Sequence, residues 1–144
     1  MSKYFIIFLG LFFSACCEIH EETTYTYDGV IIERVDECGE TFFYYNNTSE
    51  YASRILVKYS GINDGFTGYL RFEKGGKVFL LSGDGYFKTE NPDTSKFEYK
   101  RILAHQRPDI KDNVCFIQLS TRYEQEENQN SGTRIKAIYR NQKQ

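Results

Sequence analysis

Tryptophan is absent from this chain of 144 residues, and histidine, proline and methionine are scarce. Histidine-based catalysis or metal binding would depend on His105, because the other histidine, His20, lies in an acidic segment near the start of the chain. Asp109 and Asp112 follow His105, but no second histidine or pair of cysteines joins them, and we expect a solvated loop there. The lack of tryptophan argues against a stacking platform for sugars.

An excess of positive charge is also missing, because 18 Lys and Arg residues stand against 20 Asp and Glu residues. A nucleic-acid partner requires a clustered cationic surface, which this balance does not predict. The glycine-rich segments lack the Lys-Ser/Thr ending of a phosphate-binding loop, and the spaced aspartates of a calcium loop do not occur. We therefore expect no nucleic acid, no cofactor and no metal ion.

A recognisable catalytic constellation is missing as well. No nucleophile, base and orienting group can be combined from the motifs present, which predicts a protein that is not an enzyme. The acidic residues around Cys38 could contain a glycosidase carboxylate pair, but an acidic strand edge that prevents aggregation is the commoner meaning of such a cluster. These acidic residues are Glu33, Asp36, Glu37 and Glu40.

The one long apolar run of the chain occupies residues 4–13. It is too short to span a bilayer, which takes about 20 residues, but it has the length of a secretory signal. The segment Ser14-Ala15-Cys16 follows directly and supplies the small residues that a signal peptidase needs. An ordinary cleaved signal peptide, in which Cys16 is incidental, is one interpretation of this pattern.

Ser14-Ala15-Cys16 also resembles the lipobox of bacterial lipoproteins, with Phe13 at the position that is usually leucine. The resemblance implies a signal peptide over residues 1–15, lipidation of Cys16 with a diacylglycerol and usually an acyl chain such as palmitate, and an acidic tether over residues 16–23. Lipid chains hold a protein on a membrane because each buried CH₂ contributes about 0.8 kcal/mol.

The position after the lipidated cysteine bears on location. In many double-membrane bacteria, retention at the inner membrane is associated with aspartate there, and this chain has Cys17. We therefore expect a protein anchored in the outer membrane, with the periplasmic or surface side left open. A eukaryotic secreted protein, with glycosylation sequons at Asn46 and Asn47, is the alternative.

Lipidation of Cys16 leaves three cysteines in an oxidising compartment, and three pairings among them are open. We expect a disulfide between Cys38 and Cys115, because Cys17 lies in the tether. On the chain-entropy model, a bridge that closes so long a loop stabilises the fold by roughly 4–5 kcal/mol.

The remainder, residues 24–144, is expected to form a single β-domain. Asp28-Gly29 separates two strand-like segments and predicts a tight hairpin, because both residues tolerate positive φ angles. Short alternating segments and glycine-rich turns predict about eight or nine strands, and no apolar stripe of helical period is present. A small antiparallel β-barrel or a two-sheet sandwich would bury one face of each strand.

The alternation also predicts which side chains point inward. Leu70 and Phe72 are expected in the core and Tyr69 on the surface. Residues 114–123 are expected to form one strand with Cys115 inward, and residues 124–132 a polar loop. The closing strand, over residues 133–140, is expected to bury Ile135, Ala137 and Tyr139.

The segment Ser82-Gly83-Asp84-Gly85-Tyr86 resembles the Ser-Gly-x-x-Tyr motif of the membrane-bound lysozyme inhibitor family, whose members are small β-barrel lipoproteins with a disulfide. The resemblance implies a binding loop that contains Ser82, Gly83 and Tyr86, with Ser82 entering the lysozyme cleft. The second motif of that family, Tyr-x-x-x-Thr-Lys-Gly, is not reproduced in residues 88–100.

Taken together, these features predict a lipid-anchored, non-catalytic binding or envelope-interaction module. An inhibitor of lysozyme or of another envelope-attacking hydrolase is one alternative. A carrier of a small apolar ligand is the other, and it predicts an interior cavity lined by strand residues such as Phe66, Leu70, Phe72 and Phe79.

Overall fold

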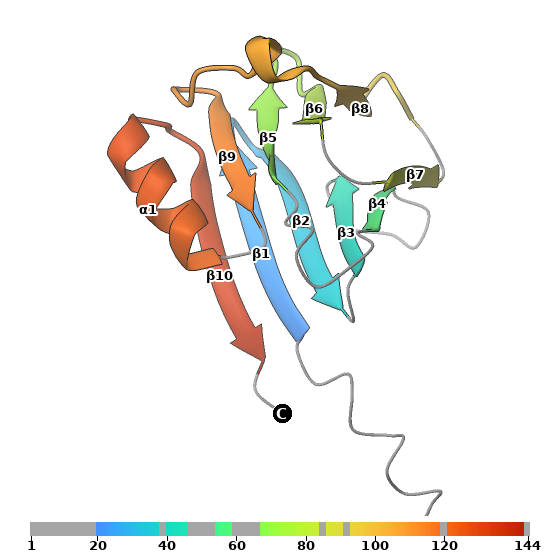
Figure 1. The fold of residues 1–144 in the computed structure, drawn as a ribbon, viewed down its shortest axis with the longest axis horizontal. Coiled ribbons are helices and arrows are strands. Elements are labelled where there is room, and N and C mark those ends of the chain that lie inside the picture. The colour runs from blue at the N-terminus through green and yellow to red at the C-terminus, as the bar shows by residue number, and fades with distance from the viewer. Residues whose placement is uncertain are drawn as a thin grey trace, which may run out of the picture.

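The computed structural model describes residues 20–37, 40–45, 54–58, 67–83, 86–90, 93–118 and 121–142. Their strands form a six-stranded sheet, in the order β10-β1-β2-β3-β4-β7, and a four-stranded sheet, in the order β8-β6-β5-β9 (Figure 1). The strands are β1 His20–Tyr27, β2 Val30–Glu37, β3 Glu40–Tyr45, β4 Arg54–Lys58, β5 Thr67–Phe72, β6 Val78–Ser82, β7 Tyr86–Glu90, β8 Phe97–Arg101, β9 Val114–Gln118 and β10 Lys136–Gln142. A 3₁₀ turn, η1 (Ala104–Gln106), and a helix, α1 (Thr121–Ser131), complete the fold.

The two sheets pack face to face, so the all-β prediction is confirmed in its sandwich form. The ten described strands exceed the expected eight or nine. The shared core contains Tyr25, Ile32, Phe43 and Ile55 from the larger sheet, and Leu70, Phe72, Leu80 and Ile117 from the smaller one. Along each strand, the inward residues alternate with outward ones, as the pleat requires.

The hairpin at Asp28-Gly29 is confirmed. Asp28 has φ 47° and Gly29 has φ 78°, and Tyr27 pairs with Val30 across the turn. Strand β1 begins at His20, four residues before the expected start, so part of the predicted tether belongs to the sheet. Thr23, in this part, is buried between β2 and β10.

One strand pair departs from the expected antiparallel pattern, because β6 and β8 run parallel. After β6 the chain leaves the smaller sheet and forms β7, which pairs with β4 in the larger sheet. It then returns to form β8 in the same direction as β6. The Phe87 ring of β7 stacks on the Tyr99 ring of β8, which closes this side of the sandwich.

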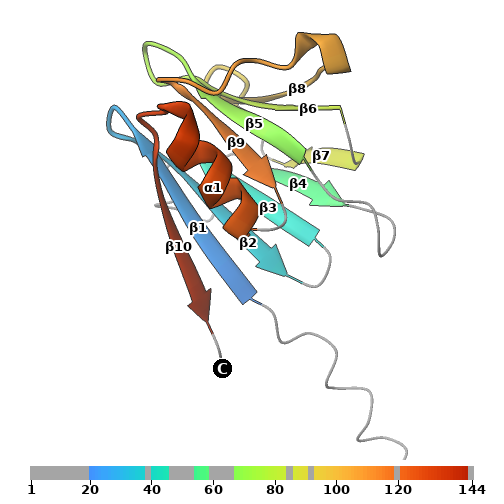
Figure 2. The same cartoon turned by 60° about the vertical axis from the view of Figure 1, so that its left-hand side comes forward.

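The opposite side of the sandwich is closed by α1, which lies beside the edge strands β9 and β10 (Figure 2). The expectation of a strand over residues 114–123 and a loop over residues 124–132 was therefore wrong, since β9 ends at Gln118 and the helix follows. No helix in the described ranges is long and apolar enough to cross a membrane.

The outer face of the smaller sheet carries a second apolar cluster. Tyr69, which was expected on the surface, is 8% exposed and packs here with Phe79, Leu81, Val114 and Phe116. The segment after β8 covers this face with Ile102 and Ile110. Tyr69 is buried because a connection, and not solvent, lies over its side of the sheet.

Candidate functional site

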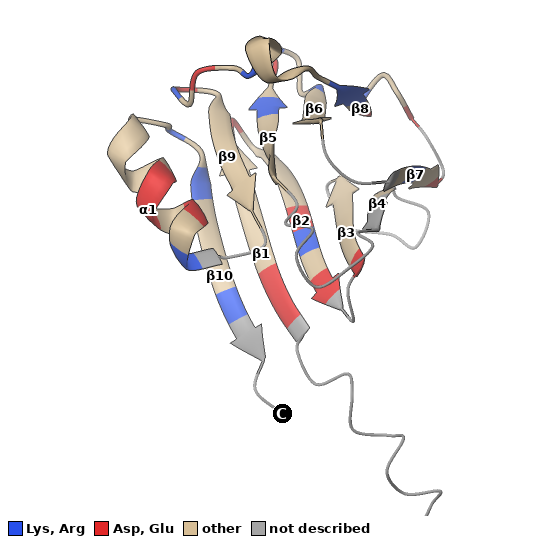
Figure 3. Ribbon diagram, in the orientation of Figure 1, with Lys and Arg blue, Asp and Glu red and all other residues tan. Residues whose placement is uncertain are grey.

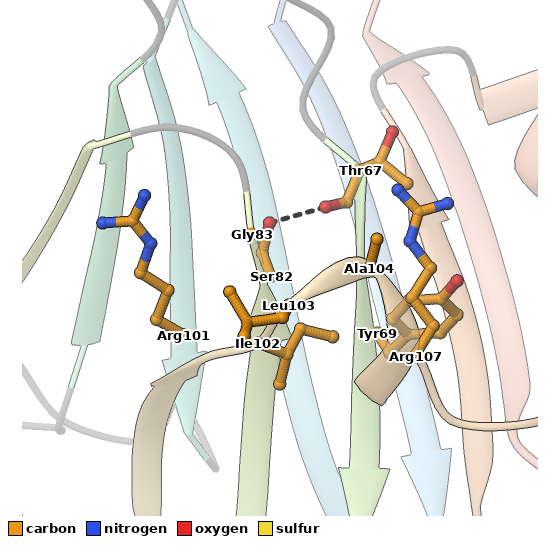
Figure 4. A pocket seen from close by; sticks show the side chains of 9 residues that line it. All are labelled: Thr67, Tyr69, Ser82, Gly83, Arg101, Ile102, Leu103, Ala104 and Arg107. Atoms are coloured by element: carbon orange, nitrogen blue, oxygen red, sulfur yellow. Dashed lines mark hydrogen bonds between the residues drawn. The ribbon is translucent and has the colours of Figure 1, made fainter.

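An open cleft of about 200 Å³ lies where β5 begins and where β6 and β8 end (Figure 4). We call it the β6–β8 cleft. Its lining comes from β5 (Thr67 and Tyr69), from the end of β6 (Ser82 and Gly83), and from the segment Arg101, Ile102, Leu103, Ala104 and Arg107. Two of the three residues predicted for a binding loop, Ser82 and Gly83, therefore belong to this lining.

Ser82 does not occupy an exposed loop, which corrects the role that the lysozyme-inhibitor resemblance implied. It is the last residue of β6 and is 1% exposed. Its hydroxyl donates a hydrogen bond of 2.6 Å to the Thr67 carbonyl, and its own carbonyl accepts one from the Ile102 amide. Ser82 thus joins three wall segments of the cleft and is not itself presented to a partner.

Gly83 allows the walls to approach each other. A Cβ atom at this position would lie 2.8 Å from the Ile102 carbonyl oxygen, so a larger residue would push the two segments apart. The third predicted residue, Tyr86, begins β7, but its side chain is outside the described part of the structure, as are Asp84 and Gly85.

The rim of the cleft is cationic. Arg101 and Arg107 are exposed and lie on either side of the segment that carries Ile102 and Leu103 (Figure 4). Within the described residues, neither arginine forms an ion pair, whereas Arg71 lies 2.7 Å from Glu73. Charge on this rim is therefore available to a ligand.

Tyr69 forms part of the wall next to this charge. Burial raises the pKa of the Tyr69 hydroxyl, the guanidinium of Arg107 lowers it, and the carboxylate of Glu127 raises it. The hydroxyl therefore remains a neutral hydrogen-bond donor at physiological pH.

The apolar part of the cleft is held by η1. The Leu103 amide donates to Gln106 Oε1 and the Gln106 amide donates to the Leu103 carbonyl, both at 2.9 Å. These reciprocal hydrogen bonds hold the Leu103 backbone, and 58% of the residue's surface is exposed. An exposed leucine beside two arginines offers a mixed apolar and cationic contact surface.

A second group of polar residues is buried between the sheets and α1. Arg34 and Glu124 are both fully buried and form an ion pair with 2.9 Å between Nη1 and Oε2. Oε2 of Glu124 also accepts the Gln118 amide, and its Oε1 accepts the hydroxyls of Tyr25 and Tyr139 at 2.7 and 2.8 Å. The carboxylate is therefore saturated with donors and has a structural role.

Arg34 is held from both sides. Its Nε atom lies 2.8 Å from Asp36 Oδ2, and its Nη1 atom donates to the Gln118 carbonyl. Burial would lower the pKa of Arg34, but Tyr25, Asp36 and Glu124 together raise it, so the guanidinium stays charged. For Glu124, burial raises the pKa of the carboxyl against the opposing effects of Arg34 and the hydrogen-bond donors.

A third polar contact docks α1 onto the edge of the smaller sheet. The Phe116 amide donates to Asn128 Oδ1, and Asn128 Nδ2 donates to the Phe116 carbonyl, both at 2.8 Å. The carboxamide thus replaces the peptide group of a neighbouring strand. Such pairing covers an edge that would otherwise be open to other chains.

Cys115 is a buried free thiol, and the described residues contain no disulfide. Its expected partner, Cys38, lies outside them. Cys115 packs in the core with Tyr25. Burial raises the pKa of the Cys115 thiol well above its usual range, which keeps it protonated and unreactive.

The acidic and histidine candidates are not brought together as a reaction centre. Asp36 points inward to Arg34, whereas Glu33 lies three residues earlier on the opposite face of β2. His105 is exposed in η1, while Asp112 lies 3.0 Å from Arg134. In the part of the chain that is described, no three potential metal ligands converge.

The anchor residues Cys16 and Cys17 lie outside the described ranges. Compared with protein-family models, curated protein sequences and solved structures, the chain has no match.

Proposed function

We propose that this protein is a lipid-anchored, non-catalytic binding module of the cell envelope, held in the outer membrane through Cys16, and that its ligand enters the β6–β8 cleft. The observation that carries this proposal is the construction of the cleft. Ser82 ties its walls together while Leu103 and two arginines remain exposed at its rim. A preformed site of this kind binds without the cost of ordering loops.

The chemistry of the lining supports binding over catalysis. Among the described residues, the cleft lining includes no histidine, cysteine, aspartate or glutamate, which are the usual general bases near neutral pH. The Ser82 hydroxyl donates to the Thr67 carbonyl at 2.6 Å. Positioned donors and an apolar wall are what a small recognition site needs.

The geometry favours this function over the two alternatives. A lysozyme inhibitor of the resembling family would use an accessible Ser82, and this side chain is buried. An apolar carrier would line one cavity with Leu70, Phe72 and Phe79, but Phe79 lies on the opposite face of the smaller sheet from the other two. Those residues therefore belong to two separate packed clusters.

The anchor is tested by lipid labelling. We expect Cys16→Ser to abolish incorporation of labelled palmitate when the full chain is expressed in a double-membrane bacterium, because the lipid is attached through this sulfur. Cys17→Ser is the matched control and should label normally. Labelling that persists in Cys16→Ser would refute the anchor.

The cleft is tested by filling it. We expect Ala104→Trp to abolish capture of an envelope component that the immobilised full chain retains, because the indole would occupy the space between Arg101 and Arg107. Thr94→Trp adds the same side chain to an exposed turn outside the lining and should leave capture unchanged. Equal capture by wild type and Ala104→Trp would overturn the proposed site.

A further inference from the structure

We propose that the β6–β8 cleft binds an oxyanionic group, a carboxylate or a phosphate, that is carried on a short branched apolar arm. This inference rests on the proposed function and names the ligand chemistry of the same site. Arg101 or Arg107, which lie on opposite sides of Leu103 (Figure 4), would bind the anion, and Leu103 would contact the arm.

The arginines supply the first argument. A guanidinium presents a planar fork of donors that matches carboxylate and phosphate oxygens, and charged hydrogen bonds of this kind are about twice as strong as neutral ones. Both arginines are exposed and lack ion pairs within the described ranges. By contrast, Lys77 lies 2.7 Å from Glu98. An incoming anion therefore would not have to displace a carboxylate of the described protein.

The charge of the described lining favours the same ligand. No acidic residue is among the described residues that line the cleft, and Glu127, which acts on Tyr69, belongs to α1 and is outside this lining. Strand β8 carries basic residues, whereas acidic residues lie on β1, β2 and β3 of the larger sheet (Figure 3). Salt leaves such fields effective over roughly 8 Å, so the attraction for an anion comes from Arg101 and Arg107 themselves.

The size of the cleft limits how much of a ligand it takes. Pockets for complete small ligands measure about 300–1,000 Å³, and this one measures about 200 Å³. It therefore fits one charged group and a few carbon atoms, with the rest of a larger ligand outside. Ile102, Leu103 and Ala104 form the apolar surface for those carbons.

The inference is tested by titrating the full chain, in detergent, with four small probes that share one branched arm. These probes are 4-methylpentanoate, isopentyl phosphate, 4-methylpentanamide and isopentylamine. We expect one or both anions to bind about tenfold or more tightly than the amide, and the amine not to bind, with affinity that falls as salt rises. Preference for the carboxylate or the phosphate identifies the source of the anion.

Arginine variants then locate the anion. Replacing both Arg101 and Arg107 by glutamine should reduce anion affinity about tenfold or more, whereas Arg140→Gln, at an exposed arginine on β10, should not change it. Equal binding of anion and amide, or anion binding that survives the double replacement, would overturn the inference. If Ala104→Trp still abolishes capture in that case, the proposed binding function stands with a different ligand chemistry.

Discussion

Replacing Glu124 by alanine is expected to lower the free energy of unfolding by about 3–5 kcal/mol, a large share of the 5–15 kcal/mol typical of a domain. The substitution removes the carboxylate that lies 2.9 Å from Arg34 and leaves a fully buried guanidinium with Asp36 as its one counter-charge among the described residues. It also removes the acceptor of the Tyr25 and Tyr139 hydroxyls. Denaturation in urea, followed by circular dichroism, measures the loss.

Glu126→Ala is the matched control, because Glu126 lies on the same helix and forms an exposed ion pair with Arg122. Such surface pairs contribute about 0.3–0.5 kcal/mol, so this variant should unfold almost as wild type does. A double replacement, Arg34→Met with Glu124→Leu, should recover part of the lost stability because it removes the buried guanidinium together with its buried partner, and only Asp36, which is partly exposed, loses an ion pair. If Glu124→Ala is as stable as Glu126→Ala, the buried network does not hold α1 in place.

The sequence predicted those parts of the fold that follow from local rules. Asp28-Gly29 determines its hairpin because few residue pairs accept two positive φ angles in succession. The inward positions of Leu70 and Phe72 follow from alternation against an apolar core. The hairpin depends on a few neighbouring residues. The inward positions depend only on which face of the strand is buried.

The helix could not be found by the same rules, because its buried side is polar. Glu124 and Asn128 lie four residues apart and point to one face, as helical periodicity requires, but both are hydrophilic. A search for an apolar stripe of helical period therefore predicted a loop over residues 124–132. The spacing of these two residues, followed by Gly132 with φ 79°, was the available signal for a helix and its end.

The cleft itself was not predicted, because its formation depends on long-range strand pairing. The Ser-Gly-x-x-Tyr resemblance singled out Ser82 and Gly83, which line the cleft, but it assigned Ser82 to an exposed loop. No local pattern in the sequence indicates that β8 returns parallel to β6 and brings Arg101 beside Ser82. Arg107 arrives through the connection that crosses the outer face, whose path is set by burial of Ile102 and Ile110.

Replacing Asn128 by alanine is expected to lower the free energy of unfolding by about 2–4 kcal/mol, since each buried polar group left without a partner costs roughly 1–3 kcal/mol. The variant leaves both the amide and the carbonyl of Phe116 without hydrogen-bond partners at the edge of the smaller sheet. Amide hydrogen exchange should accelerate at Phe116, and the uncovered β9 edge should promote self-association at high concentration. Denaturation, exchange and sedimentation measure the three effects.

Two further variants separate the loss of strand mimicry from a general defect of α1. Asn130→Ala changes an exposed asparagine of the same helix and should alter stability by less than about 0.5 kcal/mol. Asn128→Asp keeps an acceptor for the Phe116 amide but turns a second oxygen toward the Phe116 carbonyl, so it should destabilise at least as much as alanine does. Wild-type stability in Asn128→Asp would mean that the carboxamide does not act as a substitute peptide group at this edge.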